Sequence, residues 1–457
     1  MLHRPITADC VHRAELLAAF SLALDMTEGQ PDGHCIRACW IGWRIGQALG
    51  LGERELGELY YTVLLKDLGC SSNAARICEL YEADDRAFKQ GYKTIGTSLA
   101  ATLHFVFSRT AGGKPAHKRA AAIANILVNG HAIAQELILS RCTRGADIAR
   151  TLRFPDAVCA SIYHLDEHWD GSGRPGALRG SQIPLYSRLA LVAQIADVFH
   201  SHAGPGAAAD EVARRAGNWL DPEIASAFSE VARDERFWSA LRSPLLSARV
   251  VALAPIDDQI SVDDNYLDDI VAAFGEVIDA KSPFTAGHSR RVAELSHAIA
   301  LSAGCDPEQA RWIRRAGYLH DIGKLGVSSL VLEKPASLDE HEWVEMRHHA
   351  EHTRSILSRI GAFEPIADLA AAHHERLDGA GYPRRLRGDE IPLGTRIITS
   401  CDFYDALTAD RPYRFAIGRQ EALATMGAEV GRGLDVDCFN LLKAQIEKEP
   451  KGAPSAD

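Results

Sequence analysis

The C-terminal half of the sequence carries histidine and aspartate residues where apolar helical stretches end. Adjacent pairs occur in "YLHDIG" and "AAHHERLD", and single residues stand in three other segments. The set is His288, His320, Asp321, His349, His373, His374 and Asp402. Imidazole and carboxylate groups form a ligand set suited to Fe, Mn, Ni or Zn. Two such ions bridged by a carboxylate would use all seven residues.

Each residue taken alone has a simpler explanation. A lone histidine such as His297 or His341 is more often a surface or satisfied core residue, and adjacent His-Asp or His-His pairs are more often structural. Burying the whole set without a shared partner, however, would cost about 1–3 kcal/mol for each group. A marginally stable domain could not sustain that cost. A common cation removes it, so the joint occurrence indicates a metal site.

The elements that position these residues are predicted to be helices. Apolar residues recur at three- and four-residue steps in "NYLDDIVAAFGEVIDA" and "HSRRVAELSHAIALSAG", and alternating strand-like runs are scarce. This periodicity is typical of amphipathic helices. The sequence therefore predicts an all-α fold.

The sequence also repeats itself. "GHCIRACWIGWRIGQALGL" aligns with "GHSRRVAELSHAIALSAGC" at an offset of 254 residues, and "HWDGSGRPGALRGSQIPLYSRL" aligns with "RLDGAGYPRRLRGDEIPLGTRI" at an offset of 208. The first copy therefore has about 46 extra residues, which we place around 75–130. Ser, Pro and Asp residues interrupt the helical pattern between the copies. We predict two tandem helical bundle domains, 1–245 and 262–457, joined by a linker at 246–261.

Most of the candidate ligands are missing from the first copy. The two offsets align His34 with His288 and Asp67 with Asp321, but the other positions differ. The replacements are Lys66 for His320, Arg141 for His349, Leu165 for His373, Asp166 for His374 and Gln194 for Asp402. A lysine and an arginine would repel a metal ion by like charge. We expect the first domain to be non-catalytic, with His34 and Asp67 in structural roles.

Three motifs of the second copy, "HDIGK", "HHERLDGAGYP" and "DALTADRPYR", occur in an order and spacing that resemble the HD-GYP branch of the HD-domain phosphohydrolases. The resemblance covers about 190 residues. It implies a helical bundle that holds two or three divalent metal ions and hydrolyses cyclic di-GMP to pGpG and then GMP. The first copy would then be a degenerate HD domain.

The resemblance also implies roles for individual residues. The seven candidate ligands match the family's metal ligands, with Asp321 as the bridging carboxylate. Lys324 matches the family lysine that follows the HD pair, and Tyr382 belongs to the name motif; both would bind the substrate. Arg411 and Arg414 match two basic positions that would bind substrate phosphate. The three-metal members carry a glutamate where this chain has Phe284, so we expect two ions, with Fe, Mn or Ni as the best candidates.

The implied chemistry is hydrolysis of a phosphodiester by a metal-bridging hydroxide, because water shared by two cations loses its proton near neutral pH. Asp321 and Lys324 would act at the reacting centre. Two alternatives stay open. One is a cyclic-dinucleotide sensor or scaffold with little turnover, and the other is a phosphodiesterase that acts on cyclic GMP-AMP.

Composition limits the partners. The formal charge of −11 argues against a nucleic acid polymer. No apolar run of about 18 residues is evident, so no membrane span is expected. The start "MLHRPITADC" has no apolar core of signal-peptide length, which favours a cytoplasmic protein. We expect the first domain to serve regulation or dimerisation, through a second copy of the chain or a signalling protein.

Overall fold

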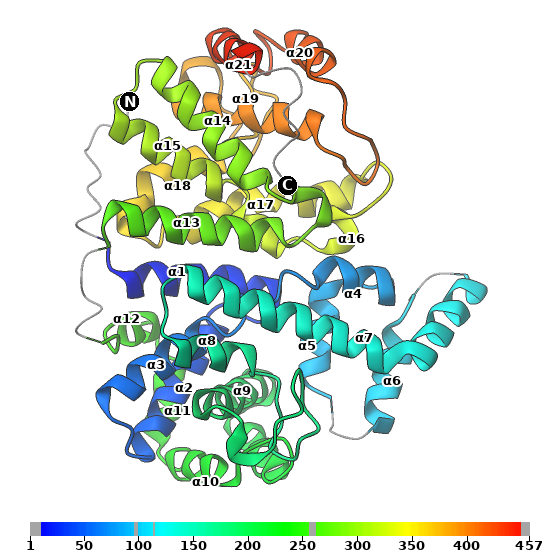
Figure 1. Ribbon diagram of the computed structural model, residues 1–457, viewed down its shortest axis with the longest axis vertical. Helices are drawn as coiled ribbons and strands as arrows, with labels where there is room; N and C mark the ends of the chain where they lie inside the picture. Colours follow the sequence, from blue (N-terminus) through cyan, green and yellow to red (C-terminus); the bar gives the residue numbers. More distant parts are fainter. Residues whose placement is uncertain (1–10, 96–98, 113–114, 256–261, 449–457) are drawn as a thin grey trace. The chain divides into compact units, whose positions relative to one another are not determined.

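The computed structural model describes residues 11–95, 99–112, 115–255 and 262–448. Within these ranges the chain consists of α-helices joined by loops and short 3-10 helices (Figure 1). β-pairing in the described residues is limited to three isolated bridges. The prediction of an all-α fold is confirmed.

The chain divides into two compact units. We call His12–Ser261 the N-terminal unit, and Val262–Asp457 with the first eleven residues the C-terminal unit. The stretch predicted as linker, 246–261, contains the helix α12 (Leu246–Val251), and its residues 256–261 lie outside the described ranges.

In the C-terminal unit, aspartate side chains cap two of the helices next to or carrying candidate ligands, α15 and α17. Asp306 accepts a backbone N–H at the start of α15, where Pro307 stands in the first turn. Asp339 and Glu342 form a capping box at the start of α17. Such caps satisfy backbone N–H groups that have no partner inside the helix. The helices are α13 (Asp264–Asp279), α14 (His288–Ser302), α15 (Pro307–Leu319), α16 (Ser329–Leu332), α17 (Glu340–Leu357), α18 (Glu364–Ala371), α19 (Leu393–Thr408), α20 (Arg419–Gly427) and α21 (Val436–Lys448).

The N-terminal unit is also built of α-helices joined by loops. Its central helix α9 runs through Leu185–Arg215 with a break at Gly204, whose φ of 86° is left-handed. The helices before α9 are α1 (Arg13–Thr27), α2 (His34–Ala48), α3 (Glu53–Leu64), α4 (Ala74–Tyr81), α5 (Asp85–Lys93), α6 (Leu99–Arg109), α7 (Ala116–Thr151) and α8 (Asp156–Tyr163). Those between α9 and α12 are α10 (Pro222–Val231) and α11 (Glu235–Leu241).

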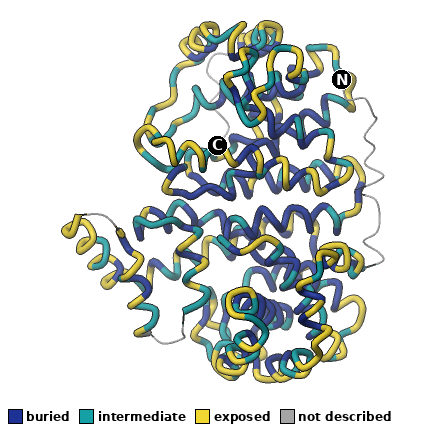
Figure 2. Tube along the Cα trace, turned by 180° about the vertical axis from the view of Figure 1, so that it is seen from behind, coloured by how far each residue is buried: buried dark blue, intermediate teal, exposed yellow. Residues whose placement is uncertain are grey.

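Helices α4 to α6 and the first half of α7 form the segment that sequence comparison marks as extra. They pack around a small apolar cluster of their own, which contains Tyr81, Phe88, Phe105 and Ile126 among its buried members. Figure 1 shows α6 and the first part of α7 projecting from the rest of this unit, and Figure 2 shows many exposed residues there.

Helix α7 is the one described helix that bears on the expectation of no membrane span. Its most apolar 18-residue window has a mean hydropathy of 1.3 and is 11% buried, so by length and composition alone it could cross a membrane. No continuous apolar run is visible in the sequence of this helix, because Asn125, Asn129, His131 and Gln135 interrupt it. One such helix is weak evidence for a membrane span, since helices of soluble proteins pass the same test.

Candidate metal centre

The seven predicted ligands come together inside the C-terminal unit. His288 is the first residue of α14, and His320 and Asp321 lie between α15 and the 3-10 helix η5 (Ile322–Gly326). His349 lies within α17, and Asp402 within α19. His373 and His374 follow the end of α18. All seven therefore lie on helices or at helix ends, which hold their backbones in fixed positions.

The imidazole rings present the same nitrogen to the centre. The Nδ1 atoms of His320, His349 and His373 lie 2.7, 2.5 and 2.6 Å from the carbonyl oxygens of Gly317, Met346 and Ala370. An Nδ1–H that donates to a carbonyl leaves the lone pair on Nε2. This arrangement is common for metal-binding histidines. The backbone carbonyls thus orient three imidazole rings so that their Nε2 atoms face Asp321.

Asp321 lies between two groups of histidines. Its Oδ2 atom is 3.5 Å from His288 Nε2 and 3.3 Å from His320 Nε2. Its Oδ1 atom is 3.7 Å from His349 Nε2 and 3.6 Å from His373 Nε2. Each carboxylate oxygen therefore faces a different pair of imidazoles, as a carboxylate that bridges two cations must.

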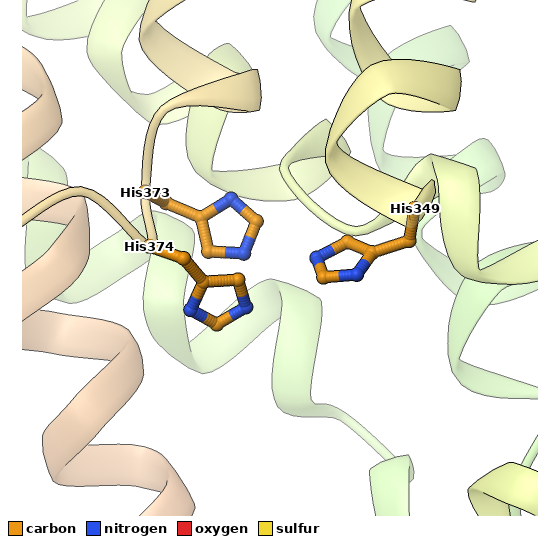
Figure 3. Close-up of side chains that lie close together, drawn as sticks. All are labelled: His349, His373 and His374. Carbon is orange, nitrogen blue, oxygen red and sulfur yellow. The ribbon is translucent and has the colours of Figure 1, made fainter. Parts of the chain in front are cut away.

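Among the described residues of this unit, three groups of side chains could each hold a cation. They are His288 with His320 and Asp321, His320 with His373 and Asp402, and His349 with His373 and His374; in each group the ligand atoms lie within 4.8 Å of one another. Figure 3 shows the rings of the last group gathered from α17 and from the loop after α18. The overlap of the groups fits a compact centre for more than one ion.

Unsatisfied polar atoms test whether a metal fits here. Oδ1 of Asp321 and Nε2 of His349 and His373 are buried and make no hydrogen bond. A buried polar atom without a partner costs about 1–3 kcal/mol. Three of them facing one centre would be a heavy loss without a shared ligand. Divalent cations that accept nitrogen and oxygen ligands would satisfy all three.

Burial and charge separate the histidines into two protonation classes. Burial, with His374 nearby, lowers the pKa of His349 to about 3, and burial lowers the pKa of His374 to about 4. Burial also lowers the pKa of His320, but the carboxylates of Asp321 and Asp402 outweigh it and raise the pKa to about 10. At neutral pH the first two are neutral imidazoles with lone pairs available, whereas His320 holds a proton that a cation would displace.

The predicted substrate-binding residues differ in their surroundings. Lys324 Nζ lies 2.5 Å from Asp321 Oδ2 and is 20% exposed. The ring of Tyr382 lies 4.8 Å from that of His374, at a tilt of 33°. Arg414 donates to the carbonyl oxygens of Ala406, Leu407 and Phe415, which follow or end α19. Among the described residues, no contact joins the side chain of Arg411 to the histidine cluster.

Sequence reasoning missed two residues that hold His288. Asp405 Oδ2 lies 2.7 Å from His288 Nδ1, and Arg291 Nε donates to Asp405 Oδ1 at 2.6 Å. Asp405 stands one helical turn after Asp402, and Arg291 stands three residues after His288, so the i, i+3 spacing was a usable signal. The pair fixes the His288 ring with its Nε2 toward Asp321.

A glycine allows the close packing of this centre. A Cβ on Gly323 would lie 1.9 Å from the carbonyl oxygen of His349. The backbone N–H of Gly323 donates to Thr353 Oγ1, and the Thr353 hydroxyl donates to the carbonyl oxygen of His320. Only glycine lets η5 approach α17 this closely, which brings Asp321 and His349 together.

The N-terminal unit has the same contact between a histidine, an aspartate and an arginine, but lysine and arginine side chains stand at two of its ligand positions. His34 Nδ1 lies 2.6 Å from Asp197 Oδ2, and Arg37 donates to the same carboxylate, as His288, Asp405 and Arg291 do. Lys66 forms a buried ion pair with Asp67. Arg141 lies 2.6 Å from Asp166. Two of the replaced ligand positions thus carry internal counter-charges.

A second buried acid in this unit is neutralised from the extra segment. Glu28, Asp67 and Cys70 lie close enough together to resemble a cation site. Lys93 and Lys89 of α5, however, lie 2.6 and 3.4 Å from the carboxylate of Glu28. Burial works against the charge of Glu28, yet both lysines hold its pKa well below the usual value. Ammonium groups occupy the place that a metal ion would take.

Known proteins resemble this chain in sequence and in overall structure. A model of the HD domain matches residues 132–224 and 273–437, so it reaches both copies of the repeat. The 3′3′-cGAMP-specific phosphodiesterase 3 of Vibrio cholerae serotype O1 is 49% identical over 437 residues, which is 96% of this chain and 95% of the relative. The chain belongs to the HD domain family. Its motifs place it in the HD-GYP branch of that family.

Two further relatives show how the similarity is distributed. A crystal structure of a cyclic GMP-AMP specific phosphodiesterase from V. cholerae matches with a TM-score of 0.67 and 44% identity, covering 96% of this chain and 99% of that chain. The cyclic di-GMP phosphodiesterase response regulator RpfG of Xanthomonas campestris is 34% identical over 188 residues, 39% of this chain and 48% of the relative. Relatives of both kinds are hydrolases of cyclic dinucleotides, as predicted for this HD-GYP chain. The comparisons favour the cyclic GMP-AMP alternative over the cyclic di-GMP expectation.

Proposed function

We propose that the chain is a metal-dependent phosphodiesterase that opens 3′3′-cGAMP, with its reacting centre in the C-terminal unit. One observation carries the proposal: Asp321 presents its two carboxylate oxygens to two separate pairs of histidine Nε2 atoms. The substrate is supported by the identity of 49% with a 3′3′-cGAMP-specific enzyme over nearly the whole length of both chains.

We infer that two divalent metal ions bind to His288, His320, Asp321, His349, His373, His374 and Asp402. When bound, such ions would activate water and polarise a phosphate oxygen. The half-buried Phe284 offers no ligand atom for a third ion. Fe, Mn and Ni all suit this mixed nitrogen and oxygen ligand set.

The protein residues around the centre have separate tasks. Asp405 and the carbonyls of Gly317, Met346 and Ala370 keep imidazole rings in the tautomer and orientation that aim Nε2 inward. Lys324, at the partly exposed edge, would stabilise negative charge that grows on the phosphate. Arg411 remains available for a phosphate, whereas the hydrogen bonds of Arg414 suit it to shaping the loop after α19.

The reaction adds water across one phosphodiester bond. The water oxygen bonds to phosphorus, the bond from phosphorus to the 3′ oxygen breaks, and a proton completes the new 3′ hydroxyl. The product is a linear dinucleotide with a 5′ phosphate. No oxidant or second substrate is needed.

The test uses purified chain loaded with Mn²⁺ or, without oxygen, Fe²⁺. Hydrolysis of 3′3′-cGAMP, cyclic di-GMP and cyclic di-AMP would be followed by chromatography. We expect 3′3′-cGAMP to be cleaved with the highest kcat/KM. His349→Ala should abolish turnover, while His348→Ala is the matched control, because His348 is the exposed neighbour of the buried His349 on the same helix.

Two results would change the conclusion. Faster cleavage of cyclic di-GMP would restore the original expectation for the substrate. Tight binding of 3′3′-cGAMP without turnover under either metal would favour a sensor.

A further inference from the structure

Beside the predicted metal centre lies a row of three side chains, and two of them, Trp343 and Arg347, are not among the predicted site residues. The guanidinium carbon of Arg347 is 5.5 Å from the centre of the Trp343 ring and 5.7 Å from that of the Tyr382 ring. Trp343 and Arg347 are four residues apart on α17, so they share one face of the helix. The row Trp343, Arg347, Tyr382 ends at the histidines, since Tyr382 contacts His374.

Two members of the row are exposed to solvent, Tyr382 is half-buried, and no ion pair neutralises the charge of Arg347 among the described residues. Trp343 is 42% exposed, and Arg347 is also exposed. Within the described part of the chain Arg347 makes no hydrogen bond or ion pair. Arg354 on the same helix shows the usual situation, because its guanidinium donates to Asp368 at 2.8 Å. An unpaired guanidinium between two aromatic rings is a preformed site for a flat, hydrogen-bonding group.

Purine bases fit such a site. Aromatic side chains bind bases by stacking, with little regard to which base is present. An arginine adds selectivity, because its two parallel N–H groups match O6 and N7 of guanine. Adenine has an amino group in place of O6 and repels the same donors. The row therefore has the chemistry to hold a purine and to prefer guanine.

We propose that Trp343, Arg347 and Tyr382 form a guanine subsite that fixes the orientation of the cyclic dinucleotide at the metal centre. The proposal rests on the proposed function and deepens it. 3′3′-cGAMP has one guanine and one adenine, so its two phosphodiester bonds are not equivalent. A guanine held by Arg347 presents one of these two bonds to the metal ions and turns the other away.

The experiment changes the base preference of this subsite. Arg347→Gln replaces the guanine-reading donors by an amide that pairs with N6 and N7 of adenine, and Arg347→Met removes hydrogen bonding while keeping an unbranched chain. Arg354→Gln is the matched control, since it removes an arginine from the same helix away from Tyr382. The kcat and KM for 3′3′-cGAMP, cyclic di-GMP and cyclic di-AMP, and the ratio of the two linear products of 3′3′-cGAMP, would be measured for each.

We expect Arg347→Gln and Arg347→Met to lower kcat/KM for the guanine-containing substrates by roughly 10- to 100-fold, mainly through KM. Cyclic di-AMP should be unaffected by Arg347→Met and improved by Arg347→Gln. Both variants should also form the two linear products in a more even ratio. Arg354→Gln should leave the preferences and the ratio unchanged.

The result that would overturn the subsite is an active wild-type chain whose base preference and product ratio survive both Arg347 variants. If the wild-type chain cleaves none of the three dinucleotides, the proposed function fails separately, and calorimetric binding of the same dinucleotides decides the subsite. Weaker binding of guanine-containing dinucleotides to Arg347→Gln would then support it. No binding by the wild-type chain, or equal binding by the variant, would refute it.

Discussion

The two copies of the repeat differ in where the positive charge at their centres comes from. In the N-terminal unit the buried Asp67 is paired with Lys66, a residue of the same chain. In the C-terminal unit the equivalent Asp321 faces four histidines and only one lysine, at the partly exposed edge. The frame around both is the same, down to the histidine, aspartate and arginine that meet at α2 and α9 or at α14 and α19.

The two copies therefore share a helical arrangement but differ in the groups that neutralise their central aspartate. An internal ammonium group neutralises a buried carboxylate permanently and cannot activate water. Under the proposed function, the imidazoles of the C-terminal copy leave the equivalent carboxylate to be neutralised by metal ions from solution, and those ions would activate water. The lysine at the position of His320 is one of five replacements at the predicted ligand positions, and the variants below test how much it contributes to the difference.

The largest effect should come from copying the N-terminal arrangement into the active centre. In His320→Lys the new ammonium group would pair with Asp321, as Lys66 does with Asp67. We expect metal content to fall and hydrolysis to drop by about 1,000-fold or more, because both water activation and charge stabilisation are lost. Turnover near the wild-type level in this variant would break the comparison.

Removing the lysine from the N-terminal pair should lower the free energy of unfolding of that unit. Lys66→Met leaves the buried Asp67 without its partner, and removing one member of a buried pair costs about 3–5 kcal/mol. Urea unfolding followed by circular dichroism would show the loss in the N-terminal unit. The double variant Lys66→Met, Asp67→Asn should recover part of it. An unchanged unfolding curve for the single variant would mean that the pair does not stabilise this unit.

A smaller loss of metal affinity is expected from changing Asp405, which contacts the predicted ligand His288. Asp405→Asn weakens the hold on His288 Nδ1, and changes of this kind typically cost 10–100-fold in metal affinity or activity. Competition with a metal-binding dye would measure the affinity. The equivalent Asp197→Asn in the N-terminal unit should leave it unchanged. Equal losses in both variants would contradict the assignment of the metal centre to the C-terminal unit.

The smallest effect concerns pH. Burial raises the pKa of Asp25 to about 7, above its unfolded value of about 3.9. The folded state therefore favours the protonated form, and stability is full at low pH and falls as pH rises toward 7. Between pH 6 and 8 this group should cost about 1.4 kcal/mol. Asp25→Asn should remove that part of the pH dependence in urea titrations.

The equivalent residue of the other copy provides the control for this change. Asp25 accepts the N–H of Cys35 just as Asp279 accepts that of Ser289. Burial raises the pKa of Asp279 to about 6. Asp279→Asn should thus act mostly below pH 7. If Asp25→Asn and wild type show the same slope from pH 6 to 8, Asp25 does not carry the predicted proton.

Much of the fold and of the candidate site could be read from the sequence. Helical periodicity predicted the all-α class, and the repeat aligned His34 with His288 although little else of the site is shared. His349 was predicted as a ligand, and the structure has it buried among the other candidate ligands, whereas its neighbour His348 is exposed. These features depend on local pattern, which a sequence records directly.

Other features depend on tertiary placement. The approach of Lys89 and Lys93 to Glu28 could not be predicted, because nothing in the sequence says where the extra helix α5 packs. Arg414 matched a substrate-binding position by motif, yet its guanidinium reaches three backbone carbonyls. The contact of Arg347 with Tyr382 joins residues from two segments that only the fold brings together.

The most direct measurement is the metal content of Asp321→Asn and Asp67→Asn, the matched aspartates of the two copies, each purified with Mn²⁺ and assayed on 3′3′-cGAMP. Elemental analysis should find two ions per chain in the wild type and in Asp67→Asn. Asp321→Asn should lose metal and turnover together. Retention of both ions and full hydrolysis by Asp321→Asn, or loss of metal from Asp67→Asn, would contradict the assignment of the metal centre to the C-terminal unit.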